Sequence, residues 1–167
     1  MRKYSFALAT AGLIGLAATQ SIAAPSSADK TFAQKAAAGG SAEVALGQLA
    51  QQNAASPQVK QFGQRMVSDH TQANQELMQI AQQQNITLSS EPDPKEQAEQ
   101  KRFAALKGAQ FDTAYTQHEV SDHKKDIADF EREAKSGQDP ALKAFAQKTL
   151  PILREHLQMA QSAASTR

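Results

Sequence analysis

Cysteine is absent from the 167-residue sequence, and its absence excludes several kinds of chemistry. No disulfide, thiolate metal site or cysteine nucleophile is available, and a lipid anchor on an N-terminal cysteine is excluded as well. Aromatic residues make up only 5% of the chain and tryptophan is missing, which leaves few side chains for stacking on bases or sugars. The fold must therefore be held together by packing of mostly aliphatic side chains.

The chain also lacks a strong charge of either sign and a long apolar segment beyond its N-terminus. Lysine and arginine number 18 against 17 acidic residues, and they are interspersed along the chain. A near-neutral, mixed surface argues against nucleic acid or an anionic membrane as a partner. Because no long uncharged apolar run follows the N-terminal segment, the sequence predicts no transmembrane segment in the mature chain.

Residues 1–23 have the pattern of a secretory signal peptide. Arg2 and Lys3 precede an apolar run that is too short and too rich in Ala and Gly for a good membrane span. Small residues at its end predict cleavage after Ala23. We therefore expect a periplasmic or otherwise exported protein, whose residues 24–167 form one domain. Without Arg2 and Lys3, 16 basic residues remain against the 17 acidic ones.

The rest of the chain has the composition of long helices, with many Ala, Gln, Leu, Lys and Glu residues. Less polar positions recur every three or four residues, which predicts helices over about residues 32–53, 57–85, 109–136 and 140–160. A proline-containing connection and a short helix from Lys95 to Lys107 join the second and third of them. We predict an all-α, ferritin-like four-helix bundle with this additional short helix. Up-down and crossover topologies both remain open.

Titratable residues interrupt the apolar stripes of the predicted helices. Five of them are candidate metal ligands: Glu43, His70, Glu119, His123 and His156. With a helical rise of about 1.5 Å per residue, all five fall near the middle of helices roughly 40 Å long, so they can converge in either topology. Imidazoles with one or two carboxylates suit zinc, iron, manganese or copper(II). The pattern therefore predicts a site for one transition metal ion.

Several neighbouring residues leave alternatives open. Asp69 and Asp122 directly precede two of the histidines, and either is a weak candidate for an outer-shell acceptor because consecutive helical residues point about a quarter turn apart. His118 lies off the stripe and is predicted to be a surface residue. If Gly39-Gly40 interrupts the first helix, Glu43 becomes a first-turn residue instead of an interior ligand. The histidines can also be core residues that bond to a backbone carbonyl or to Glu43.

Three functions fit these observations. We favour a non-enzymatic periplasmic metal-binding protein for buffering, sensing or delivery. A second possibility is a metal-dependent oxidoreductase, which requires an open coordination position. A third is a structural or stress-related interaction module, a homo-oligomer included, whose histidines pack or sense pH near their ordinary pKa of about 6.5. Hydrolase motifs such as a serine elbow, a phosphate loop or a zinc-protease helix are absent from the sequence.

Four ordered blocks of the sequence resemble a known family. They read AAAGGSAEVALGQLA, VKQFGQRMVSDHTQAN, FDTAYTQHEVSDH and LKAFAQKTLPILREHL and span about residues 32–160. These blocks are similar to those of a bacterial exported family known only as a domain of unknown function. The resemblance implies a ferritin-like four-helix fold and no established activity. It also implies that Glu43, His70, His123 and His156 occupy motif positions of that family.

Diiron ferritins differ from this chain in one respect that bears on the metal site. They carry a Glu-x-x-His pair on each of two helices. Here the residues three positions before the interior histidines are Val67, Val120 and Leu153. The sequence therefore predicts a mononuclear, histidine-rich site in place of a ferroxidase centre.

Overall fold

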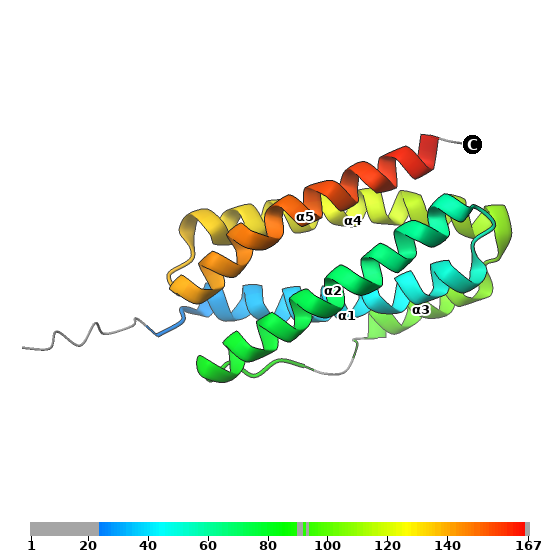
Figure 1. Ribbon diagram of the computed structural model, residues 1–167. Helices are drawn as coiled ribbons and strands as arrows, with labels where there is room; N and C mark the ends of the chain where they lie inside the picture. Colours follow the sequence, from blue (N-terminus) through cyan, green and yellow to red (C-terminus); the bar gives the residue numbers. More distant parts are fainter. Residues whose placement is uncertain (1–23, 90–91, 93, 166–167) are drawn as a thin grey trace, which may run out of the picture.

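The computed structural model describes residues 24–89, 92 and 94–165, so the predicted signal peptide at residues 1–23 lies outside the described residues. Five helices make up the described part: α1 (Ser27–Asn53), α2 (Pro57–Gln83), α3 (Pro94–Ala105), α4 (Gly108–Ser136) and α5 (Pro140–Ser165). No strand occurs within these ranges. The prediction of an all-α bundle with a short extra helix between the second and third long helices is confirmed (Figure 1).

Helix α1 is longer than predicted and is not interrupted. Ser26 and Asp29 form a capping box, in which each side chain accepts a hydrogen bond from the other residue's backbone N–H, so the helix begins at Ser27. The helix continues through Gly39 and Gly40 to Asn53. Glu43 therefore lies in the middle of a long helix and is not a first-turn residue.

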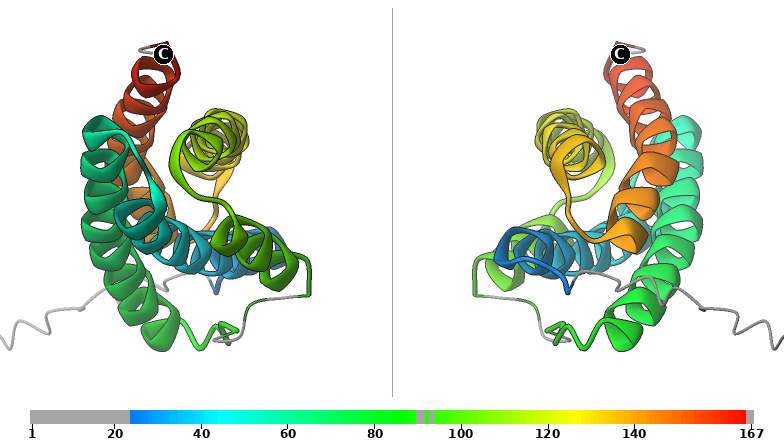
Figure 2. Two further views of the ribbon diagram at one scale, coloured as in Figure 1. Left: turned by 90° about the vertical axis from the view of Figure 1, so that its right-hand side faces the viewer. Right: turned by 90° about the vertical axis from the view of Figure 1, so that its left-hand side faces the viewer.

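The four long helices form two antiparallel hairpins that pack side by side. Helices α1 and α2 pair closely, as do α4 and α5, while α2 also contacts α5 and α1 also contacts α4 (Figures 1 and 2). The short helix α3 lies outside this group of four, against α1 and α4. Each interior position is therefore surrounded by residues from neighbouring long helices.

Hydrogen bonds at the two ends of the bundle determine its topology. Near the start of α4, the Asp112 carboxylate accepts the backbone N–H groups of Ala55 and Ser56 in the α1–α2 turn, at 3.1 and 2.9 Å. At the opposite end, the Asp29 carboxylate of α1 accepts the N–H groups of Gln138 and Asp139 in the α4–α5 turn. Helices α2 and α4 therefore run in the same direction, and the connection that carries α3 is a crossover.

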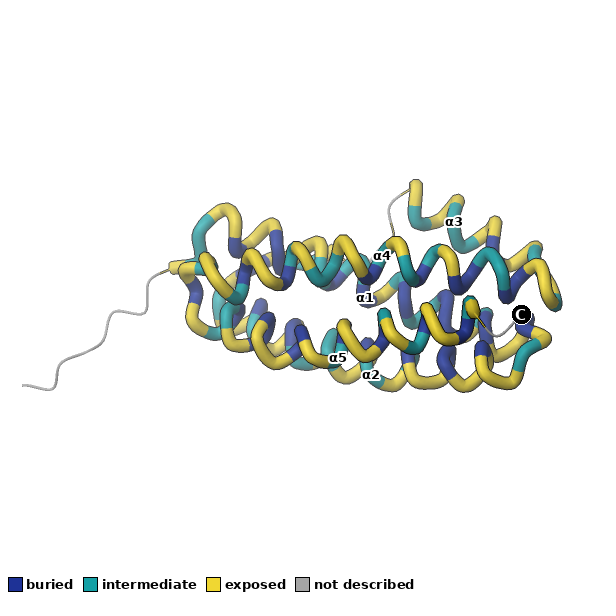
Figure 3. Tube along the Cα trace, turned by 90° about the horizontal axis from the view of Figure 1, so that it is seen from above, coloured by how far each residue is buried: buried dark blue, intermediate teal, exposed yellow. Residues whose placement is uncertain are grey.

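Two apolar clusters fill the core, one toward each end of the bundle. The first includes Phe32, Leu77, Phe130, Leu142, Phe145 and Leu153. The second includes Leu46, Phe62, Met66, Phe103, Phe111 and Tyr115. Buried residues line the inward faces of the long helices (Figure 3). The buried residues Glu43, His70, Glu119, His123 and His156 fall between the two clusters along the chain, so the apolar core is divided by a polar layer.

Close contact between α1 and α2 depends on two glycines. A Cβ atom added to Gly63 would lie 2.6 Å from the Cβ of Ala50 and 2.8 Å from the carbonyl oxygen of Gly47. A Cβ atom added to Gly47 would lie 2.7 Å from the carbonyl oxygen of Gly63. Because the carbonyl oxygens belong to helical backbone, they cannot rotate away from a new methyl group.

We expect the substitution Gly63→Ala to lower the free energy of unfolding by about 1–3 kcal/mol, because overpacking outweighs the better helix propensity of alanine. Gly39→Ala is the matched control. Nothing lies within 4 Å of a Cβ atom added there, so this substitution should stabilise the protein by up to about 1 kcal/mol. Urea unfolding followed by circular dichroism measures both effects. Equal midpoints for the two variants would contradict the contact between α1 and α2.

Candidate metal centre

Three of the predicted ligands converge in the middle of the bundle. His70 of α2, His123 of α4 and His156 of α5 each place one ring nitrogen within 4.8 Å of the other two. The ring centroids of His70 and His123 are 6.0 Å apart, and each of the other two pairs is separated by 5.4 Å. The three residues are 7%, 0% and 1% exposed, respectively. The cluster is therefore enclosed by protein.

Hydrogen bonds on the outer side of the cluster define the protonation of two rings. Nδ1 of His123 lies 3.1 Å from the backbone carbonyl oxygen of Glu119, to which it can only donate. Nε2 of His156 lies 2.9 Å from Oδ2 of Asp69, and an ionised carboxylate is likewise only an acceptor. In the neutral rings, the hydrogens therefore lie on His123 Nδ1 and His156 Nε2. The remaining nitrogens, His123 Nε2 and His156 Nδ1, are lone-pair acceptors.

These two acceptors face each other at 3.4 Å. Two lone pairs in this arrangement repel each other unless a cation lies between them. Two nitrogen ligands of a tetrahedral zinc ion, each about 2.0–2.1 Å from the metal, are separated by about 3.4 Å. The third ring adds another available nitrogen, because Nε2 of His70 is buried and has no hydrogen-bond partner among the described residues. The cluster therefore presents one nitrogen from each ring within 4.8 Å of the other two, and the His123–His156 pair has the spacing of zinc ligands.

Burial keeps the three imidazoles in the form that binds metal. Burial, together with the neighbouring His156, lowers the pKa of His123 to about 4. The pKa of His70 is lowered well below its ordinary value by burial and by the other two histidines. Burial also lowers the pKa of His156, although the Asp69 carboxylate opposes this shift. All three rings are consequently neutral at pH 7 and have lone pairs available.

Asp69 acts across the bundle and not on its sequence neighbour. It follows Ser68 and precedes His70 on α2, yet its carboxylate accepts from His156 on α5 and also pairs with Arg65. A carboxylate that accepts from the outer nitrogen of a ligating histidine fixes the tautomer and makes the ring a better donor to metal. The sequence predicted Asp69 as a weak candidate for an acceptor in the outer shell of the metal site. Because it lies one residue before His70 on α2, its side chain points toward α5 and bonds to His156 instead.

We expect Asp69→Asn to weaken zinc binding by about 10- to 100-fold, because the variant loses the negative charge that supports His156. Glu155→Gln is the matched control. It removes a carboxylate beside His156 in the sequence, but this side chain is 52% exposed and bonds to Arg65 only at the surface. Its zinc affinity should stay within about threefold of wild type. Competition titration with a chromophoric chelator measures both, and equal losses would exclude a specific role for Asp69.

The two predicted glutamates lie next to the histidines but in a group of their own. Glu43 of α1 and Glu119 of α4 approach each other and His118, and Glu43 also approaches Asp122 and Asp126. The two groups are adjacent, since Oε2 of Glu119 lies 3.4 Å from Nδ1 of His123. The structure thus brings together three of the five predicted ligands in one cluster and the other two in a second.

The prediction that His118 is a surface residue is wrong. Its side chain is only 16% exposed, and Nδ1 lies 3.3 Å from Oε1 of Glu99 on α3. Its ring centroid is 5.2 Å from that of Phe103, which also belongs to α3. Helix α3 covers this side of α4, which the periodicity of α4 alone does not indicate.

A narrow pocket between the long helices has His70 in its wall. Its lining also includes Gly39, Asp126 and Asp129. Because Gly39 has open space where a side chain would be, a substituent there would extend into this pocket. Lys35 lines the same pocket, so the approach to His70 carries charged groups of both signs.

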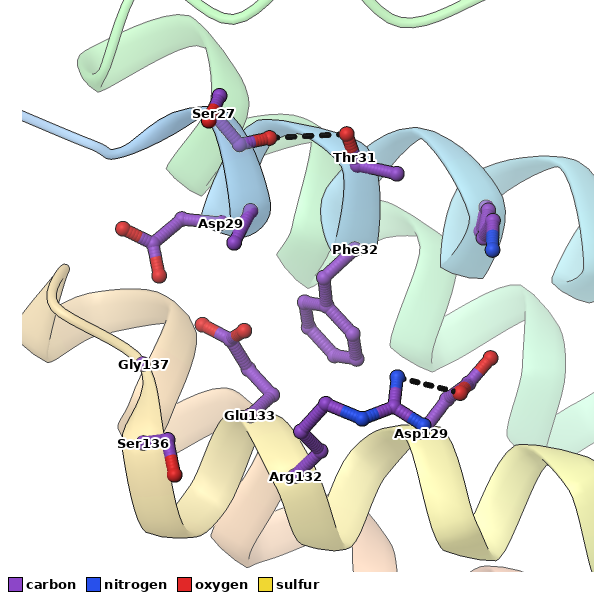
Figure 4. A pocket seen from close by; sticks show the side chains of 11 residues that line it. Ser27, Asp29, Thr31, Phe32, Asp129, Arg132, Glu133, Ser136 and Gly137 are labelled. Atoms are coloured by element: carbon purple, nitrogen blue, oxygen red, sulfur yellow. Dashed lines mark hydrogen bonds and ion pairs between the residues drawn. The ribbon is translucent and has the colours of Figure 1, made fainter.

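A further pocket has a structural explanation. It measures about 370 Å³ and lies where the start of α1 meets the end of α4 (Figure 4). Figure 4 shows the carboxyl groups of Asp29 and Glu133 turned toward each other. The Asp29 carboxylate already accepts hydrogen bonds from two backbone N–H groups. Burial and the neighbouring Asp29 carboxylate together raise the pKa of Glu133 to about 7. Asp29 thus connects α1 to the α4–α5 turn, and the pocket is lined by none of the predicted ligands.

Comparison with known proteins places the chain in a family. A model of a family described as a domain of unknown function (DUF4142) matches residues 15–163. The chain belongs to this family. The DUF4142 match includes both clusters, from Glu43 to His156. No curated protein and no solved structure matches the chain. Within the described residues, none of the helices has the length and apolarity that a membrane crossing requires.

Proposed function

We propose that this DUF4142 protein binds one transition metal ion through His70, His123 and His156, and that it buffers, senses or delivers that metal in an exported compartment. The observation that carries the proposal is the pair of facing lone pairs on His123 and His156. Their outer nitrogens have acceptor partners, so no proton remains to join them. A metal ion that also binds His70 satisfies all three inward nitrogens at once.

The donor set indicates which metals fit. Three neutral imidazoles suit zinc, copper(II) and iron, and three protein ligands leave the fourth position of a tetrahedral zinc ion for water or for an exchanging ligand. An open position favours exchange of the metal over permanent structural binding. The carboxylate beside the site, Asp69, is engaged with His156 and supports the ring from outside.

Elemental analysis of untagged protein purified from its native compartment tests the proposal. We expect close to one metal ion per chain in the wild type and almost none in the His70→Ala, His123→Ala double variant. The zinc-dependent rise in melting temperature should disappear in the same variant. If neither protein contains metal, and zinc, iron, manganese and copper all fail to stabilise the wild type, the histidines are packing residues and the interaction module becomes the better function.

A further inference from the structure

Polar atoms without partners are concentrated beside the histidines, at the α1–α4 interface. Eight buried side-chain nitrogen and oxygen atoms in the described residues have no hydrogen-bond partner, and five of these belong to Glu43, Glu119 and Tyr115. Glu43 is 1% exposed, and Glu119 and Tyr115 are fully buried. Tyr115 lies one helical turn before Glu119. Burial raises the pKa of its hydroxyl well above the ordinary value, and the charges of Glu119 and Glu43 and a side-chain interaction with Glu119 raise it as well.

Basic side chains do little to compensate the carboxyl groups at this interface. Carboxylate oxygens of Glu43, Asp122 and Asp126 lie within 4.8 Å of one another, and those of Glu43 and Glu119 are equally close. Among the described residues, neither glutamate forms an ion pair with a lysine or arginine, and the one such partner of Asp122 is the exposed Lys125. Buried carboxylates in proteins are paired with cations or coordinate metal ions, because an isolated buried charge is strongly unfavourable.

We propose that Glu43, Glu119 and His118 form a second cation site, which takes a divalent ion that prefers oxygen ligands, such as Mn²⁺. One oxygen of each glutamate and one nitrogen of His118 lie within 4.8 Å of one another. Carboxylates with a single imidazole suit manganese better than the all-nitrogen histidine cluster does. Asp122 and Asp126 lie around Glu43 and add negative potential. This site does not depend on metal binding by His70, His123 and His156.

The competing explanation is that the two glutamates share a proton and bind nothing. Substitution by glutamine separates these explanations, because glutamine has nearly the shape of a protonated glutamate. If the carboxyl groups only share a proton, no Mn²⁺ binds between them, and Glu43→Gln leaves any manganese binding elsewhere unchanged. If they hold a cation, the substitution removes one charged ligand and weakens binding.

Manganese titration followed by electron paramagnetic resonance tests the site in a His70→Leu background, where the histidine cluster lacks one of its three ligands. We expect one bound Mn²⁺ per chain, and at least a tenfold loss of affinity on adding either Glu43→Gln or Glu119→Gln. Glu155→Gln, at the surface, serves as the control and should leave the affinity unchanged. Circular dichroism and thermal melting of the single Glu43→Gln variant confirm that this variant folds, whether or not the histidines bind zinc.

Failure of this proposal is distinguishable from failure of the histidine site. Absence of bound Mn²⁺, or Mn²⁺ binding that survives both glutamine substitutions, overturns the second site and leaves a proton-sharing pair. Manganese binding that is lost with the glutamates in a protein that fails to bind zinc supports the second site and overturns only the histidine site.

Discussion

His70→Leu should make the metal-free protein more stable while abolishing zinc binding by the histidine cluster. Nε2 of His70 is buried without a partner, and leaving such an atom unsatisfied costs about 1–3 kcal/mol. Leucine has a similar volume and extends the apolar stripe that already contains Met66 and Leu77. We expect the free energy of unfolding to increase by about 1 kcal/mol, which raises the melting temperature by roughly 2–4 °C for a domain of this size.

The same substitution removes one of three nitrogen ligands. Zinc affinity should fall by at least about 1000-fold, because two histidines no longer enclose the ion. Calorimetry in EDTA and in zinc measures the two effects: the variant melts higher than wild type without metal, and zinc no longer raises its melting temperature. Opposite effects on stability and binding are typical of a functional site that is retained at some cost to the fold.

Thr149→Val is a control for polar-to-apolar substitution in the core. The hydroxyl of Thr149 is buried but donates to the carbonyl oxygen of Phe145 at 2.9 Å, so it has a partner. This variant should retain full zinc affinity. If His70→Leu melts below wild type in EDTA while zinc still stabilises it fully, His70 is a structural residue and the metal centre is wrong.

Much of the helical architecture could be predicted from the sequence because local signals determine it. Ser56 followed by Pro57 starts α2 as predicted, with the Ser56 hydroxyl accepting the N–H of Val59. The crossover could not be predicted, because it depends on contacts between distant segments. Asp112 and Asp29 fix the two ends of the bundle through bonds to residues more than 50 positions away in the chain.

The helical rise per residue correctly placed the five candidate ligands at similar positions along the bundle axis. It did not give the direction in which each side chain points around that axis. His123 and Glu119 are one turn apart on α4, yet His123 meets α2 and α5 whereas Glu119 meets Glu43 of α1. That division depends on which helices are neighbours, so a single-helix periodicity cannot give it. Asp126 was missed for the same reason, although its spacing of seven residues from Glu119 places it on the same helical face.

The stability of the metal-free protein should fall as the pH rises, and Glu119→Gln should remove much of this fall. Burial raises the pKa of Glu119 from 4.5 to about 8, and burial with the neighbouring Glu119 charge raises that of Glu43 well above its ordinary value. The folded state therefore retains protons that the unfolded chain releases above its own pKa of about 4.5. The resulting stabilisation is complete below that pH and is lost as the pH rises toward 8.

The histidines change the stability with pH in the opposite direction and over a different pH range. Their lowered pKa values destabilise the folded state as the pH falls below about 6.5, where the unfolded chain takes up protons that the folded protein cannot. Above about pH 7 they are neutral in both states and contribute no slope. Measurements between about pH 6.5 and 8.5 therefore report on carboxyl groups with raised pKa values, which also include Asp126 and Glu133, both at about 7.

The difference between wild type and Glu119→Gln isolates the contribution of the buried pair. Over this range we expect wild type to lose about 2 kcal/mol more than the variant, which corresponds to roughly 4–8 °C in melting temperature. Thermal melts in EDTA at several pH values measure it, and the exposed substitution Glu155→Gln should follow wild type. Parallel curves for wild type and Glu119→Gln would mean that Glu119 ionises as easily in the folded protein as in the unfolded chain. That outcome would require water or a cation to reach the α1–α4 interface even in metal-free buffer.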